Sequence, residues 1–146
     1  MSEVTFSSIR DGVISALAER LPEVRVLGEG TTEPLTPPFC MVRLTVGAQQ
    51  QELNRRHSCS CSFTIEYVPA QDNPGQLIYE YAGHLYDLFR EVEIDGALYR
   101  GIEMKHEVKE GVLHFHFVFR FLIWLPEPDE PKMRMLKEEE RLKNDV

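Results

Sequence analysis

The sequence predicts an α+β fold, with a mainly antiparallel sheet built from two β-hairpins, two amphipathic helices packed on one face of that sheet, and a charged C-terminal arm. Two observations indicate this fold. Apolar residues recur at helical spacing in two segments, and they alternate with polar residues in several others. The length of 146 residues suits one domain. We therefore expect a single α/β domain over residues 1–125, followed by a Pro-rich and then charged arm over residues 126–146.

Two segments carry the spacing of three and four residues that gives a helix one buried stripe. The first runs from residue 4 to residue 21 and is ended by Pro22, with apolar positions at Phe6, Ile9, Val13, Ala16, Leu17 and Leu21. The second follows a break over residues 69–75 and runs to about Glu91, with Leu77, Tyr81, Leu85 and Leu88 as its stripe. Between the helices, residues 24–27 form a short β-branched run that leads into a loop rich in Gly and Pro at 28–38.

The first hairpin is expected to join the alternating segment from Cys40 to Val46 to the segment SCSCSFTIEY. A loop of even length centred on Asn54-Arg55 would bring the apolar residues of both strands to one face. The pairs predicted by this loop are Val46–Phe63, Leu44–Ile65 and Val42–Tyr67.

The second hairpin is expected to turn at Glu110-Gly111 and to join residues 98–108 to residues 112–125. Asp95-Gly96 predicts a further tight turn before it. The predicted pairs are Val108–Leu113, His106–Phe115 and Met104–Phe117 on the apolar face, and Glu107–His114 on the polar face. The return strand is long for a small sheet, so we expect part of it to serve another subunit.

The net charge of −8 argues against a protein that binds nucleic acid by bulk electrostatics. The longest apolar stretch, over residues 112–125, is interrupted by His114, His116 and Arg120 and is far shorter than the about 20 residues of a spanning helix. The N-terminal residues lack the pattern of a secretion signal. Three cysteines are an odd number, which favours reduced thiols in a cytosolic compartment. We expect no membrane association.

The histidines are the first candidates for chemistry, because His114 and His116 project from the same face of one strand. Cross-strand polar pairs with Glu107 and Lys105 explain them better than a metal site does. His106 falls on the apolar face, where a partly buried, hydrogen-bonded histidine is expected.

The cysteine pair Cys59-x-Cys61 lacks the two-residue spacing of zinc ligands and is expected to pack in the core. No nucleophile elbow, phosphate-binding loop or H-E-x-x-H motif occurs. We therefore expect no catalytic, cofactor-binding or metal-binding residues, and no enzyme.

Protein-interface residues are the remaining candidates. Arg55, Arg56 and His57 form a small basic cluster at a hairpin tip, which is either a solubilising turn or a contact to an acidic surface or to passing DNA. The other candidates lie on outward strand faces or in the arm, and they are Arg43, Glu103, Lys105, Glu107, Arg120, Met133 and Leu136. The arm has few apolar residues, so we expect it to be mobile in an isolated subunit and to become ordered on assembly.

Several blocks of the sequence occur in the order found in one protein family. The stretch QQELNRR, the strand ending in FTIEYVP and the stretch VEIDGALYRGIEMKHEVKEGVLHFHFVFRF resemble the tail terminator proteins of tailed bacteriophages and prophages, over roughly residues 6–121. The resemblance implies a non-enzymatic structural protein without cofactors, which forms a ring of six subunits. Such a ring caps the head-proximal end of the tail tube, stops tube polymerisation and offers a surface for head or neck attachment.

The resemblance also implies a set of partners and a location. The partners would be other copies of the chain, the tail tube protein, a neck or head-completion protein and, in a contractile tail, the sheath protein, with DNA only passing through the lumen. The protein would lie in the virion tail, after assembly in the host cytoplasm. Strand edges at residues 98–108 or 40–46 are candidates for pairing between subunits, and inward-facing carboxylates would make the channel repel DNA.

Two alternatives remain open at this point. A head-completion or neck connector protein shares the small size and ring symmetry. A small-molecule-binding or metal-dependent enzyme would instead use a cleft between the sheet and the helices, with His106, His114 or His116 as functional residues.

Overall fold

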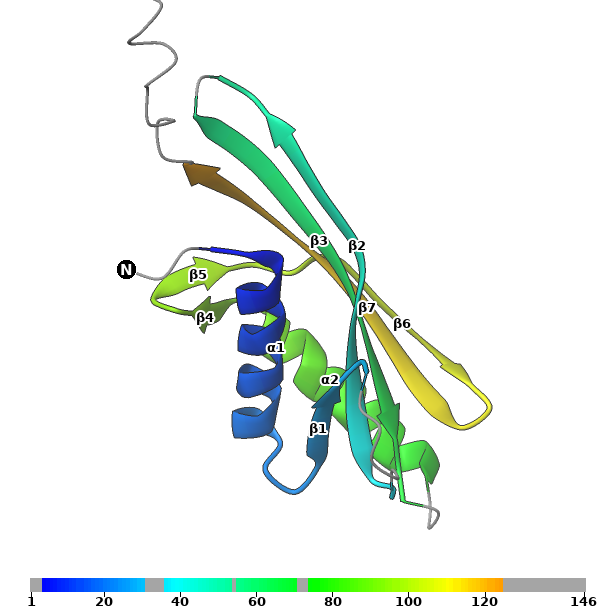
Figure 1. Ribbon diagram of the computed structural model, residues 1–146. Helices are drawn as coiled ribbons and strands as arrows, with labels where there is room; N and C mark the ends of the chain where they lie inside the picture. Colours follow the sequence, from blue (N-terminus) through cyan, green and yellow to red (C-terminus); the bar gives the residue numbers. More distant parts are fainter. Residues whose placement is uncertain (1–3, 31–35, 54, 71–73, 125–146) are drawn as a thin grey trace, which may run out of the picture.

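The computed structural model describes residues 4–30, 36–53, 55–70 and 74–124, and it confirms the α+β fold class (Figure 1). Two helices lie on one side of a five-stranded sheet, and a two-stranded hairpin lies beside the first helix. The arm at 126–146 lies outside the described residues, so the domain boundary at residue 125 stays a prediction. The elements in chain order are α1 (Phe6–Arg20), β1 (Arg25–Gly28), β2 (Phe39–Gln51), β3 (Arg56–Val68), α2 (Pro74–Arg90), β4 (Val92–Ile94), β5 (Ala97–Tyr99), β6 (Ile102–Lys109) and β7 (Val112–Trp124).

Local chemistry sets where both helices begin. The Oγ1 atom of Thr5 accepts a hydrogen bond from the backbone N–H of Ser8 at 3.0 Å, and the Oγ atom of Ser8 accepts one from the N–H of Thr5 at 2.8 Å. This reciprocal cap satisfies two N–H groups that the first turn of α1 leaves without partners. Helix α2 begins at Pro74, inside the segment predicted to be a break, because proline suits the first helical turn. No helix in the described part of the chain is long and apolar enough to span a membrane.

The five-stranded sheet has the order β1-β2-β3-β7-β6, and only the β1–β2 pair is parallel. The predicted strand over residues 98–108 is wrong as one element, because β5 pairs with β4 in a separate hairpin and the chain enters the main sheet only at Ile102. Gly101 marks the break. Its N–H donates to the carbonyl oxygen of Phe89 at 2.7 Å, a close approach that leaves no room for a Cβ atom.

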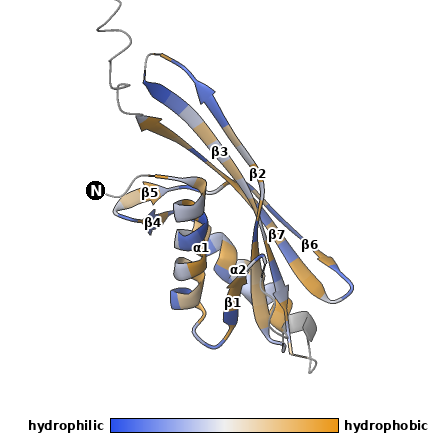
Figure 2. Ribbon diagram, viewed as in Figure 1, coloured by the Kyte–Doolittle hydropathy of each residue, from blue (hydrophilic) through white to orange (hydrophobic). Residues whose placement is uncertain are grey.

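The core lies between the helices and one face of the sheet, which we call the helix face. Apolar residues gather there, as the hydropathy colouring in Figure 2 shows. Phe89 of α2 stacks on Phe117 of β7 with ring centroids 4.3 Å apart, and Phe63 of β3 stacks on the same ring at 5.3 Å. Cys40, Cys59 and Cys61 are buried, and the core packing predicted for Cys59 and Cys61 is confirmed. The opposite face of the sheet carries neither helix, and we call it the open face.

The predicted register of the first hairpin is wrong. The observed pairs are Val42–Ile65, Leu44–Phe63 and Val46–Ser62, with a β-bulge between Leu44 and Val46. The connection after Gln51 encloses five residues before His57, an odd number, and the extra residue Thr45 then reverses the alternation once more. Val46 therefore lies on the open face with an exposed fraction of 57%, not in the core.

The second hairpin follows the prediction near its turn and departs from it further away. The pairs Val108–Leu113, His106–Phe115 and Glu107–His114 are confirmed. The pair Met104–Phe117 is wrong, because a second irregularity lies between Ile102 and Lys105, where Glu103 has a φ of 53°. Both tight turns have two successive residues with positive φ, namely Asp95-Gly96 and Glu110-Gly111, which is the signature of type I′ hairpin turns.

Candidate protein-interaction surfaces

A row of polar side chains crosses four strands on the open face. Arg43 of β2 pairs with Thr64 of β3, Thr64 pairs with His116 of β7, and His116 pairs with Lys105 of β6. Directly paired residues of an antiparallel sheet point to the same side, so these four side chains share one surface. The structure therefore brings together three of the predicted interface positions, Arg43, Lys105 and the adjacent Glu107.

Hydrogen bonds organise the centre of this row. The Nδ1 atom of His116 lies 2.9 Å from the Oγ1 atom of Thr64, and its Nε2 atom lies 3.4 Å from the Oε1 atom of Glu107. The Nζ atom of Lys109 is also 3.4 Å from Glu107 Oε1. The hydrogen bond from His116, followed by the contact with Lys109, lowers the pKa of the exposed Glu107 carboxyl. The polar pairing between β6 and β7 that the sequence predicts is therefore present on this face.

Ion pairs within the chain already engage other predicted interface residues. The Nε atom of Arg43 contacts the Oε1 atom of Glu66 on the neighbouring strand. The Nη2 atom of Arg120 lies 3.4 Å from the Oε2 atom of Glu103 at the β6 irregularity. These pairs are exposed and contribute little stability, about 0–1 kcal/mol each. The open face is consequently a mixed surface of paired charges, not a basic patch.

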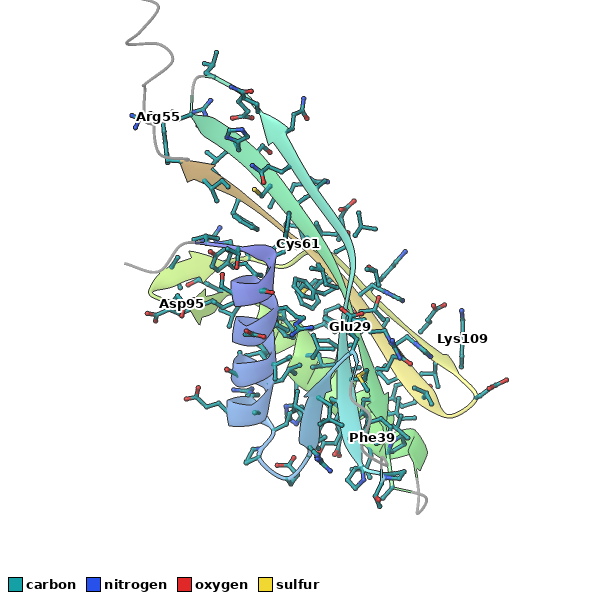
Figure 3. All side chains as sticks on the ribbon, viewed as in Figure 1. Glu29, Phe39, Arg55, Cys61, Asp95 and Lys109 are labelled. Carbon is teal, nitrogen blue, oxygen red and sulfur yellow. The ribbon has the colours of Figure 1, made fainter. Side chains whose placement is uncertain are left out.

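The basic cluster at Arg55, Arg56 and His57 lies apart from that row. Figure 3 shows Arg55 at the tip of the β2–β3 hairpin and Lys109 at the opposite end of the sheet. The tip is closed by backbone hydrogen bonds from Arg56 N–H to the Leu53 carbonyl at 2.8 Å and from the N–H of Glu52 to the Arg56 carbonyl at 2.9 Å. Arg56 also forms an ion pair with Glu52 at 2.9 Å. The predicted interface residues thus do not form one surface, because Arg120, paired with Glu103, lies between the polar row and the hairpin tip. Met133 and Leu136 lie outside the described residues.

Two of the three candidate histidines, His106 and His116, line one groove beside the β6 irregularity, and His114 lines another near the β6–β7 turn. His106 projects from the helix face of β6, where its Nδ1 atom lies 2.9 Å from the Tyr86 hydroxyl, whereas His114 and His116 project from the open face. His106 is hydrogen-bonded as predicted, but it is exposed instead of partly buried, because it lies near the outer edge of the sheet. Within the described part of the chain, no three His, Cys, Asp or Glu side chains are placed to hold a metal ion.

The cysteine thiols are equally unsuited to chemistry. Burial raises the pKa of the Cys40 thiol to about 12, and burial together with the charge of Cys59 raises that of Cys61 to about 12. A thiol with such a pKa forms little thiolate at neutral pH. These cysteines act as small apolar residues of the core, as the sequence predicts.

A set of exposed apolar side chains on the open face is the feature that the sequence reasoning missed. It consists of Val46 of β2 and, further along the sheet, Leu122 and Trp124 of β7, which have exposed fractions of 57%, 52% and 66%. Two signals could have revealed it. Gly47 inside a strand often marks a bulge, and the open-face positions of β7 change from His114 and His116 to Leu122 and Trp124 along the strand.

These exposed apolar residues lie where three strands extend past the helices. We call this part the distal ribbon, made of Val46–Gln51, Arg56–Cys61 and Phe119–Trp124 (Figure 1). Its residues are paired across the ribbon in register, for example Gln49 with Cys59 and Cys59 with Phe121. The projecting ribbon is the most prominent candidate surface for contact with another molecule.

The comparisons with known proteins give one family. The model of a family described as phage tail terminator protein matches residues 8–132. No curated protein matches the chain. Among the solved structures, one chain aligns with 86% of this chain and with 100% of its own length, at 14% sequence identity and a TM-score of 0.41.

Proposed function

Because the chain belongs to the phage tail terminator protein family, we propose that it forms a ring on the head-proximal end of a finished tail tube, where it stops tube polymerisation and provides the surface for head or neck attachment. The match of the family model over residues 8–132 carries this proposal. The family is a structural one, which implies a non-enzymatic role. The proposed ring has six subunits, assembles in the host cytoplasm and remains in the virion tail.

The physical requirement on a terminator is asymmetry. A tube grows because each ring of tube protein exposes a surface that binds the next ring. A terminator has to bind that surface on one side and present a side that does not recruit tube protein on the other. The sheet described above has two unlike faces, one packed against the helices and one that carries neither helix, which supports such a role.

Ring closure requires subunit surfaces that are complementary head to tail. Open strand edges are such surfaces, because an edge presents N–H and C=O groups that a neighbouring strand can satisfy. Of the two edges expected from the sequence, residues 40–42 are covered by β1, whereas the β6 edge is open among the described strands. The part of β2 beyond Thr45 is also open in that part of the structure.

The charge distribution decides which side of each subunit would have to face the channel for the channel to repel DNA. The open face combines acidic and basic residues, whereas acidic side chains line a groove between α1 and β4, among them Asp11, Glu19, Glu91 and Glu93. A channel that repels DNA phosphates would therefore have the helix side of each subunit facing inward. The surface potential of an assembled ring tests this orientation, and a basic channel wall would contradict it.

Deleting the gene from the phage and examining the particles by electron microscopy tests the function. We expect tails of excessive or irregular length, which purified protein restores to uniform length when it is added during tube assembly. A head-completion or neck connector protein would instead give tails of normal length beside unjoined heads. Normal tails joined to heads would contradict both functions.

A further inference from the structure

One edge of the distal ribbon is chemically suited to pairing with another strand. Among the described residues, β1 pairs with β2 only as far as Val42, and no strand pairs with the outer side of Val46–Gln50. This segment, with the sequence VGAQQ, has no charged residue and no proline. Edge strands that remain free in solution usually carry such protective residues. The edge strand β6 has them, with Lys105, Lys109 and the irregularity at Glu103.

The other edge of the same ribbon is open as well. Strand β6 pairs with β7 only over Val112–Val118, and within the described chain no strand continues along Phe119–Trp124. Leu122 and Trp124 from this segment are more than half exposed on the open face. Large apolar side chains beside an unpaired strand edge are costly to leave in water, and together they mark an interaction site.

The two open edges are matched in level, direction and face. Gly47 and Phe119 both pair with Cys61, and Gln49 and Phe121 both pair with Cys59, so the segments lie at the same height on opposite sides of β3. Each is antiparallel to β3, and they are therefore parallel to each other. Because the edges face in opposite directions, a second copy placed beside the first would bring its β2 edge to the β7 edge of its neighbour.

We infer that the subunits of the assembled protein join through these edges, with Val46–Gln50 of one copy adding as a parallel strand beside Phe119–Trp124 of the next copy. The occupant of each edge is thus a second copy of this chain. At the level set by β3, the pairing places Ala48 of one copy beside Arg120 of its neighbour and Gln50 beside Leu122, so that the exposed Leu122 side chain is covered at the boundary. This inference rests on the proposed ring, since a head-to-tail contact closes into a ring when the rotation between subunits allows it.

A lysine placed in the β2 edge tests the contact. Ala48 lies on the open face in the middle of this segment, so Ala48→Lys adds a charge where the neighbouring strand would lie. We expect loss of the ring-sized species in light scattering and loss of binding to tube ends, with an unchanged circular dichroism spectrum and melting temperature. Tyr79→Lys, at an exposed position of α2, is the matched control and should assemble like the unmodified protein. Normal assembly of a folded Ala48→Lys variant would overturn the inference.

Cross-linking distinguishes the head-to-tail contact from other arrangements, and it does not depend on the lysine variant folding. Ala48→Cys and Arg120→Cys lie at the same level on the two edges, since both residues pair with Ser60. The two variants carry different tags and are mixed, in solution and on tail tubes, with a short bis-maleimide. The three native cysteines are buried, so the unmodified protein serves as the unreactive control.

We expect cross-links between the two variants and none within either variant alone. Products within Ala48→Cys alone would indicate a symmetric β2–β2 contact and overturn the inference. Absence of intermolecular products that is reversed by removing residues 126–146 would assign the β7 edge to the chain's own C-terminal segment and would also overturn it. Tubes capped by unmodified protein without these cross-links would leave the proposed function standing and the contact wrong. Cross-linked rings that leave tube length unchanged would instead support the contact and contradict the proposed function.

Discussion

Phe89 of α2 lies stacked on Phe117 of β7, with ring centroids 4.3 Å apart and ring planes at 18° to each other. Both rings are buried, and Phe115, Phe119 and Phe63 surround them. This stack joins the second helix to the strand that holds the distal ribbon. The position of the ribbon relative to the helices therefore depends on the packing of a few aromatic rings.

Phe89→Ala is expected to lower the free energy of unfolding by about 3–5 kcal/mol, because it leaves a cavity in the centre of the core. Tyr79→Ala on the exposed side of the same helix should change it by less than about 0.5 kcal/mol. Urea denaturation of the two variants measures the difference. Equal effects of the two substitutions would contradict the described packing of α2.

Two glycines should respond to alanine in opposite ways. A Cβ atom at Gly101 would lie 2.7 Å from the carbonyl oxygen of Phe89, so Gly101→Ala should destabilise the fold. Gly83 lies on the exposed side of α2 with open space around it, and Gly83→Ala should stabilise the protein by about 0.5–1 kcal/mol. Thermal denaturation of both variants shows whether each substitution raises or lowers the stability. A stabilising Gly101→Ala would mean that β5 and β6 are connected differently.

The bulge at Thr45 gives two valines of strand β2, Val42 and Val46, opposite burial. Val42 is fully buried, so Val42→Ala should cost about 2 kcal/mol. Val46 lies on the open face, and Val46→Ala should cost less than about 0.5 kcal/mol in the isolated subunit. Chemical denaturation of the monomeric protein measures both costs. A large loss of unfolding free energy in Val46→Ala would indicate that Val46 is buried and that the register expected from the sequence is correct.

The buried thiols predict a loss of stability at high pH. Burial raises the pKa of Cys40 and Cys61 to about 12, above the 9.0 of an ordinary thiol. Between these values the unfolded chain releases the thiol protons while the folded chain retains them, so the unfolding free energy should fall from about pH 9 towards pH 12. The double variant Cys40→Ala, Cys61→Ala should show a shallower decline in denaturation experiments at a series of pH values. It retains part of the slope, because burial also raises the pKa of Tyr67, Tyr81 and Tyr99. An unaltered slope in the variant would contradict thiol burial.

The pKa of Glu107 should depend on its neighbour His116. We expect the Glu107 carboxyl to titrate below the ordinary glutamate value, and His116→Asn to move its pKa towards that value. Its contribution to stability is present above the unfolded-state pKa and is lost as pH falls through the lowered value. Carbon NMR of the side-chain carboxyl measures this pKa. Lys105→Gln, which removes a charge that does not contact Glu107, serves as the control.

The sequence predicts features that depend on neighbouring residues. Glu110-Gly111 fixed the register of the second hairpin near its turn, and the stripe of Ile9, Val13 and Leu17 marked the buried side of α1. Alternation along β3 and β7 also identified the helix face correctly. In each case the signal lies within a few residues, where spacing in sequence sets position in space.

The differences between the predicted and the observed strands come from single residues that interrupt a regular pattern. Thr45 and Glu103 each add an irregularity that a strict alternation cannot represent, and each one changes which side chains face outward beyond it. Gly101 separates β5 from β6 through a contact with Phe89, a residue of another element. The exposed apolar residues Val46, Leu122 and Trp124 were missed for the same reason, because their assignment to one face requires the register of three strands.

The burial of all three cysteines has a consequence for the durability of a released particle. In the proposed virion location, the protein would meet dissolved oxygen and peroxides outside the host cell. Thiols without access to solvent and with little thiolate are poor targets for these oxidants. Outside its host, the protein should therefore form neither cysteine sulfenic acid nor disulfides between subunits over time.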